Sequence, residues 1–186
     1  MKTRIYLIIA LMAGLGLSLR AEKFHARAIF DLRGDVREVA VKTDNPFAFY
    51  KKVSFTSDGC LSYKPMAYGE DGFPIGFGVP VSGKLDNTLL FFDEDGRLVS
   101  VLNQKVSEKT TQNITLTNVY DGTRLVERKT SCQEDCGIPT YKLIYDGEKY
   151  DAQGNWIERN VHQTTLLPDG SAKETVYVET RKITYY

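Results

Sequence analysis

The chain has 186 residues, of which 42% are hydrophobic, and its 24 basic residues balance 24 acidic ones. The apolar content excludes a wholly disordered chain, and the charge balance argues against the basic surface of a nucleic-acid binder. Only two histidines and three cysteines occur, too few for a dense disulfide scaffold.

The N-terminus predicts a signal peptide over residues 1–21. Lys2 and Arg4 precede an apolar run from Ile5 to Leu19, which is shorter than the roughly 20 residues of a membrane-spanning helix. The small residue Ala21 suits a cleavage site. We therefore expect a periplasmic or secreted protein with a single domain over residues 22–186 and no membrane span after leader removal.

Tight turns divide the remaining sequence into short β-strands. Asp-Gly pairs occur six times and favour the backbone angles of hairpin turns, and the runs between them are rich in Val, Ile, Thr, Tyr and Phe. The expected strands are Phe24–Arg33, Val36–Thr43, Phe47–Thr56, Cys60–Tyr68, Thr88–Phe92, Arg97–Lys105, Gln112–Tyr120, Thr123–Thr130, Ile138–Tyr145, Asn155–Leu166 and Ala172–Tyr186. The predicted fold is all-β, a twisted, mostly antiparallel sheet of consecutive hairpins. The sequence does not decide whether this sheet curls into a half-barrel or forms a sandwich.

The stretch from Lys64 to Gly83 interrupts this pattern with Pro65, Pro74, Pro80 and five glycines. Proline cannot donate a ladder hydrogen bond, so the stretch is either an irregular loop or an edge strand broken by prolines. A long connection and a surface loop near a binding site are both open interpretations.

One turn motif resembles a known family. Tyr150-Asp151-Ala152-Gln153-Gly154-Asn155-Trp156 is similar to the YD repeats of RHS-type proteins, whose signature is an aromatic residue, Asp, two variable residues, Gly and Asn. Partial copies lie at Phe55–Leu61, Phe92–Leu98 and Tyr120–Leu125. The resemblance implies β-hairpins in a small secreted bacterial protein, and it implies no particular ligand. Independently, Asp can accept a hydrogen bond two residues on, and Gly tolerates the left-handed position.

The same motif supplies the candidate binding residues. They are Tyr150, Asn155 and Trp156, and the functional interpretation is that Trp156, Tyr150 and nearby tyrosines form a platform on which a sugar stacks. The alternative is that these side chains pack in the core and across the strand pair.

The sequence offers little for catalysis or metal binding. His25 and His162 do not have the spacing of a zinc site, and no nucleophile elbow occurs, so we expect no metal and no cofactor. In an exported protein, Cys132 and Cys136 are the candidate disulfide, which would leave Cys60 buried.

These features favour an exported non-enzymatic protein with a binding or scaffolding role at the bacterial envelope. The expected partner is a glycan or an envelope protein, and nucleic acid is not expected. Two alternatives remain open. One is a glycan hydrolase that uses a pair of carboxylates from different strands. The other is an inhibitor or partner protein that uses the loop at residues 64–83.

Overall fold

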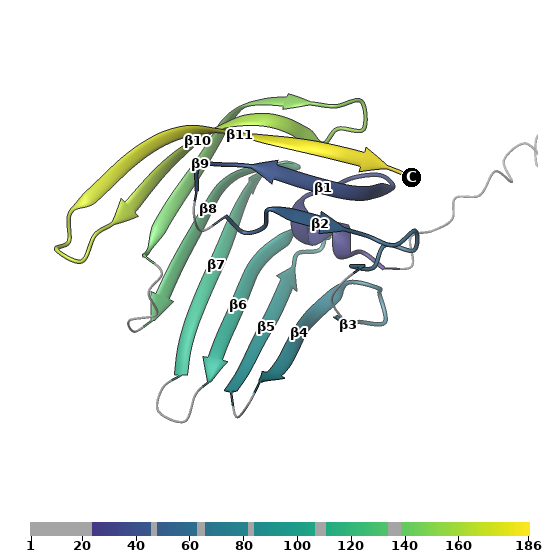
Figure 1. The fold of residues 1–186 in the computed structure, drawn as a ribbon, viewed down its shortest axis with the longest axis horizontal. Helices are drawn as coiled ribbons and strands as arrows, with labels where there is room; N and C mark the ends of the chain where they lie inside the picture. The colour runs from purple at the N-terminus through teal and green to yellow at the C-terminus, as the bar shows by residue number, and fades with distance from the viewer. Residues whose placement is uncertain (1–23, 46–47, 63–65, 82–83, 107–110, 134–138) are drawn as a thin grey trace, which may run out of the picture.

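The computed structural model describes residues 24–45, 48–62, 66–81, 84–106, 111–133 and 139–186, and these form one curved antiparallel sheet (Figure 1). A short 3-10 helix, η1 (Ala26–Phe30), precedes the strands. The described strands are β1 (Val36–Lys42), β2 (Lys52–Ser54), β3 (Ala67–Tyr68), β4 (Pro74–Val81), β5 (Lys84–Phe92), β6 (Leu98–Val106), β7 (Thr111–Asp121), β8 (Arg124–Gln133), β9 (Tyr141–Tyr150), β10 (Trp156–Leu166) and β11 (Ala172–Tyr185).

The strand order is β2-β1-β11-β10-β9-β8-β7-β6-β5-β4-β3. Every strand from β3 to β11 therefore lies beside its neighbours in sequence, as consecutive hairpins require. The exception is β1, which pairs with β11 and brings the two ends of the described chain together. The expected all-β architecture is confirmed, and the chain forms one sheet rather than the two sheets of a sandwich.

One face of the sheet carries the core. On β11, Tyr177, Glu179 and Arg181 are buried, whereas the intervening Val176 and Val178 are exposed, because successive side chains of a strand point to opposite faces. Figure 1 shows η1 within the curve of the sheet, beside β1 and β2. Ile29 and Phe30 of η1 belong to the main hydrophobic cluster.

The prediction of a strand over Phe24–Arg33 is wrong, because Ala26–Phe30 forms η1. Four of its five residues are buried, namely Ala26, Arg27, Ile29 and Phe30. A strand with one packed face cannot bury consecutive side chains in this way, so tertiary packing overrides the strand preference. The turn ends at Asp31, which has a left-handed φ of 53°.

The Asp146-Gly147 pair is not a hairpin turn, contrary to expectation. It lies inside β9, where Gly147 has a φ of +61° and the register with β10 shifts. The pair is a β-bulge, which the local pattern of Asp followed by Gly does not distinguish from a turn.

Both edges of the sheet are short strands. Among the described residues of the runs expected over Phe47–Thr56 and Cys60–Tyr68, the strands of the sheet are Lys52–Ser54 and Ala67–Tyr68. Short edges limit the open backbone groups on which another chain could pair. Within residues 64–83, the edge-strand interpretation is confirmed for β3, whereas β4 lies between β3 and β5. Pro74 occupies the first position of β4, where proline is tolerated.

The N-terminal segment connects the two edges. The N–H of Phe24 donates to the carbonyl of Asp58, after β2, at 3.1 Å, and the N–H of His25 donates to the carbonyl of Gly72, after β3, at 2.9 Å. The His25 ring lies 4.6 Å from the Phe73 ring. The two open edges are therefore held close to each other at this end of the sheet.

Candidate functional site

A five-residue turn recurs at the ends of the hairpins. In each copy the N–H of the first residue donates to the carbonyl of the fifth, and the N–H of a glycine at the fourth position donates to the carbonyl of the first, all at 2.8–3.1 Å. The copies are Thr56–Cys60, Gly69–Phe73, Asp93–Arg97, Asp151–Asn155 and Leu167–Ser171. The sequence motif identified three of them, and the copies at 69–73 and 167–171 were recognised only as Asp-Gly turns.

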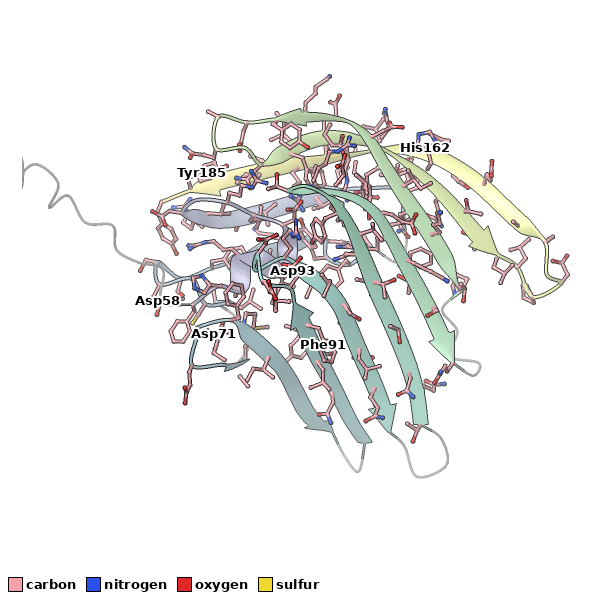
Figure 2. All side chains as sticks on the ribbon, turned by 180° about the vertical axis from the view of Figure 1, so that it is seen from behind. Asp58, Asp71, Phe91, Asp93, His162 and Tyr185 are labelled. Carbon is pink, nitrogen blue, oxygen red and sulfur yellow. The ribbon has the colours of Figure 1, made fainter. Side chains whose placement is uncertain are left out.

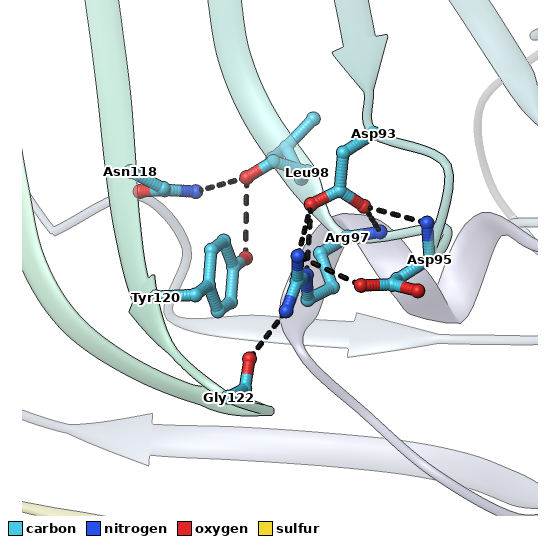
Figure 3. A network of polar contacts seen from close by, with 7 residues as sticks. All are labelled: Asp93, Asp95, Arg97, Leu98, Asn118, Tyr120 and Gly122. Atoms are coloured by element: carbon cyan, nitrogen blue, oxygen red, sulfur yellow. Dashed lines mark hydrogen bonds and ion pairs between the residues drawn. The ribbon is translucent and has the colours of Figure 1, made fainter.

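The Asp93 copy shows how these turns are fixed and joined (Figure 3). Asp93 Oδ1 accepts the N–H of Asp95 at 3.1 Å and that of Arg97 at 2.9 Å. The Arg97 guanidinium pairs with the same carboxylate at 2.7 Å and donates to the carbonyl of Gly122 in the next turn. Partial desolvation raises the pKa of Asp93, but the hydrogen bonds and charge of Arg97 outweigh this effect and hold the pKa below its ordinary value.

Asn155 binds the N-terminal segment to this end of the sheet. Its side chain is 2% exposed, and its Oδ1 accepts the N–H of Arg33 at 2.7 Å. Its Nδ2 donates to the carbonyl of Arg33 at 2.9 Å and to the hydroxyl of Tyr185 at 2.8 Å. The structure therefore places Asn155 in a buried structural contact that leaves its amide no free hydrogen-bonding group for a ligand.

The segment that Asn155 holds forms one wall of a pocket, which we call the turn pocket. It has a volume of about 290 Å³ and lies between the β7–β8 turn, the β9–β10 turn and residues Asp31–Arg33. The charged and aromatic groups that line it are Asp31, Arg33, Arg124, Glu148, Tyr150, Trp156 and Arg159. Its volume is close to the lower limit for small-molecule sites in proteins, about 300 Å³.

Glu148 is the unusual group in the turn pocket. Its side chain is 5% exposed, and one carboxylate oxygen, Oε2, lies 3.4 Å from the guanidinium of Arg124. The other oxygen, Oε1, is buried and has no hydrogen-bond partner. Partial burial and the charge of Glu148 raise the pKa of Tyr150. A buried carboxylate oxygen is normally hydrogen-bonded, so Glu148 Oε1 lacks a partner that such an atom usually has.

Two predicted residues, Tyr150 and Trp156, meet in the turn pocket. Tyr150 is 49% exposed, whereas Trp156 is 4% exposed. The guanidinium carbons of Arg159 and Arg181 lie 3.9 and 3.6 Å from the Trp156 ring centre, so the two groups hold the ring between them. Packing therefore accounts for the indole faces, and only Tyr150 presents an open ring. The indole N–H of Trp156 is buried and has no hydrogen-bond partner.

Trp156 and Arg159 also line a second, interior cavity of about 30 Å³ on the concave face. Arg159 lies 3.5 Å from the Tyr145 ring centre and binds Glu179 through two nitrogens at 3.0 and 2.7 Å. Burial lowers the pKa of Arg159, but Tyr145 and Glu179 more than offset this effect and raise it. The Arg159–Glu179 ion pair is thus buried in the core.

Two larger hollows continue from the turn pocket along the same end of the sheet. One, of about 480 Å³, shares Asp31, Arg33 and Thr123 with it. The next, of about 800 Å³, is lined by Phe73, Phe92 and several carboxylates on the turns. Figure 2 shows Asp71, Asp93 and Tyr185 at this end, and His162 far from it. In the described ranges, only the turn pocket combines an open aromatic ring with an unpartnered buried carboxylate oxygen.

The remaining predicted residues lie elsewhere. Cys132 is disulfide-bonded and Cys60 is a half-buried free thiol. Cys136 lies outside the described residues, so the Cys132–Cys136 pairing stays a prediction. His162 is exposed, 2.9 Å from the Asp146 carboxylate. Across the part of the chain that the structure describes, no group of three His, Cys, Asp or Glu residues gathers as metal ligands would.

Comparison with known protein families, with curated proteins and with solved structures gave no match to this chain. Among the residues that the structure describes, no helical segment has the length and apolar character needed to cross a membrane. The functional argument therefore rests on the pocket itself.

Proposed function

We propose that the protein is an exported, non-enzymatic binding protein of the bacterial envelope, and that its turn pocket binds a neutral saccharide. The observation that carries the proposal is the buried, unpartnered Glu148 Oε1 in a pocket that also presents the open ring of Tyr150. Export is supported by the apolar leader at residues 1–21, which lies outside the described residues.

The charges around the turn pocket favour a neutral ligand. Arg33 and Arg124 oppose a cation, and Asp31 and Glu148 oppose an anion. The unpartnered groups are one acceptor, Glu148 Oε1, and one donor, the indole N–H of Trp156. Hydroxyl groups can both donate and accept, and the apolar face of a sugar ring packs well on an aromatic side chain. A saccharide carries donors, acceptors and such a face in one molecule.

The proposal is tested by titrating the purified protein with neutral mono- and disaccharides in a calorimeter. Tyr150→Ala and Glu148→Ala are each expected to weaken binding about tenfold or more, which corresponds to about 1.4 kcal/mol. Phe91→Ala is the matched control, because Phe91 is an exposed aromatic side chain outside the pocket (Figure 2), and it should bind normally. Absence of saccharide binding would reject the proposal and favour the partner-protein alternative at residues 64–83.

The same samples test export and catalysis. Protein recovered from the periplasmic fraction should begin near Glu22, and a cytoplasmic protein that retains residues 1–21 would contradict export. The hydrolase alternative keeps one supporting observation, because the carboxylates of Asp31 and Glu148 line the same pocket. Cleavage of a bound oligosaccharide, lost in Glu148→Gln, would replace binding with hydrolysis as the function.

A further inference from the structure

The interior cavity on the concave face has an unusual lining. It lies against β1, the chain between β1 and β2, and strands β8 to β10. Its polar lining includes Tyr50, Arg128, Arg159 and Glu179, and its volume is about 30 Å³. Roughly 10–15 Å³ is needed to hold one water molecule, so the space admits one or two species of that size. It is too small for a saccharide, and it shares only Trp156 and Arg159 with the turn pocket.

The groups around this cavity carry more positive than negative charge. Arg128 and Arg159 line the cavity and are 9% and 5% exposed, and Glu179 is the one carboxylate among its lining residues. Arg181, 9% exposed, lies next to the lining, against the Trp156 ring. Arg159 donates two hydrogen bonds to the Glu179 carboxylate, from Nε and from one terminal nitrogen. Arg128 donates through Nε to the neutral amide oxygen of Asn118 at 2.8 Å. Arg181 donates to the backbone carbonyls of Phe30 and Asp31 at 2.7 and 3.2 Å.

Hydrogen-bond donors are also in excess here. The hydroxyl of Tyr50 and the Nε of Arg181 are buried and have no hydrogen-bond partner of normal geometry, although the two side chains interact with each other. Burial raises the pKa of Tyr50, so its hydroxyl keeps its proton and remains a donor. Burial, together with repulsion from Arg159, lowers the pKa of Arg181. Unpaired buried donors and uncompensated charge both cost free energy, and an acceptor with negative charge would relieve both.

We infer that the interior cavity binds a monatomic anion, with chloride as the physiological species. Arg128 supplies the positive charge that no buried carboxylate matches, and the Tyr50 hydroxyl supplies a hydrogen bond. Phosphate and sulfate have no room in a space of about 30 Å³, and water would fill the volume without balancing the charge. The ion would be a structural part of the core, where it stabilises the folded state in proportion to its occupancy.

The first experiment measures thermal unfolding of the purified protein as chloride replaces gluconate at constant ionic strength. The unfolding midpoint is expected to rise with the logarithm of the chloride concentration once the site begins to fill. A crystal grown in bromide should show an anomalous peak inside the cavity, beside Arg128 and Tyr50. A cavity that holds only water, or a midpoint that does not depend on chloride, would overturn the inference.

Variants separate the site from a general salt effect. Arg128→Met should abolish the chloride dependence, because it removes the unmatched charge and keeps a side chain of similar length. Tyr50→Phe removes one hydroxyl and should weaken bromide occupancy, which keeps the inference testable if Arg128→Met does not fold. Lys142→Met removes an exposed charge of the Lys142–Glu127 pair and should leave the dependence unchanged. An equal chloride dependence in all three variants would contradict the site.

Discussion

At the scale of single residues, the side chains that shape the candidate site are fixed by contacts between distant parts of the sequence. Asn155 contacts Arg33, 122 positions away, and Tyr185, 30 positions away. Its motif predicted a turn correctly, but the sequence contains no sign that the amide would be buried. Nothing in the sequence indicated that the Trp156 ring would be covered, because the two arginines that cover it come from β10 and β11.

Replacing Asn155 by alanine should destabilise the protein by about 2–4 kcal/mol, because it leaves the N–H and carbonyl of Arg33 without their partners. Urea denaturation measures the change. Asn160→Ala is the matched control, since the Asn160 amide donates to Asp146 in an exposed pair, and it should cost less than about 1 kcal/mol. Equal costs for the two variants would contradict the structural role of Asn155.

Glu148 is the site residue that sequence analysis missed, and the reason is the bulge at Gly147. On β9 the buried residues are Tyr141, Leu143 and Tyr145, so simple alternation predicts an exposed side chain at an even-numbered position. The extra residue of the bulge changes which face the following side chains take, and Glu148 becomes buried. The signal was present as Asp146-Gly147, but it had been interpreted as a turn.

At the scale of elements, the strands from β5 to β8 and from β10 to β11 could be predicted because each hairpin is specified locally. Alternating side chains identify the strand, and Asp and Gly identify the turn. The predictions were wrong where packing decides the structure, as in η1, or where a strand is too short to show a pattern, as in β2 and β3. The joining of neighbouring turns, such as Arg97 to Gly122, was also beyond local pattern.

Two turn glycines differ in what surrounds them, and this difference can be tested. Gly122 has a φ of +57° and open space around it, whereas a Cβ on Gly96, at φ +73°, would lie 2.7 Å from the Phe73 ring. Gly122→Ala should cost about 1–2 kcal/mol for the left-handed backbone alone. Gly96→Ala should cost about 2–4 kcal/mol, because the ring must also shift. Urea denaturation measures the loss of unfolding free energy in both variants. A smaller loss for Gly96→Ala than for Gly122→Ala would contradict the close contact between Gly96 and the Phe73 ring.

At the scale of the whole molecule, the sheet is completed by the pairing of β1 with β11. Ile183 of β11 lies opposite Val39 of β1 and packs on the main cluster, which also contains Ile29, Phe30 and Val53. This single contact region therefore supports η1, β1 and β2 together. The sequence predicted the hairpins but not this long-range pairing, since nothing local in either strand specifies the other.

Ile183→Asp should release η1, β1 and β2 while β5 to β8 keep their structure, at a cost of about 2–4 kcal/mol. Hydrogen exchange should show faster exchange in residues 26–54 than in the native protein and unchanged protection in β5–β8. Val178→Asp is the control on the same strand, because Val178 is exposed, and it should cost less than about 1 kcal/mol. Uniform loss of protection in Ile183→Asp would show that the sheet unfolds as one unit.

The partnership of β1 and β11 also governs when the protein can fold. The strand at residues 36–42 has no neighbour on one side until residues 180–185 have been made. At 5–20 residues per second, a chain of 186 residues takes roughly 10–40 s to synthesise, and for that time its N-terminal part lacks its final partner. The segment at residues 36–42 therefore takes its place in the sheet last, after the hairpins from β5 to β8 have had time to form.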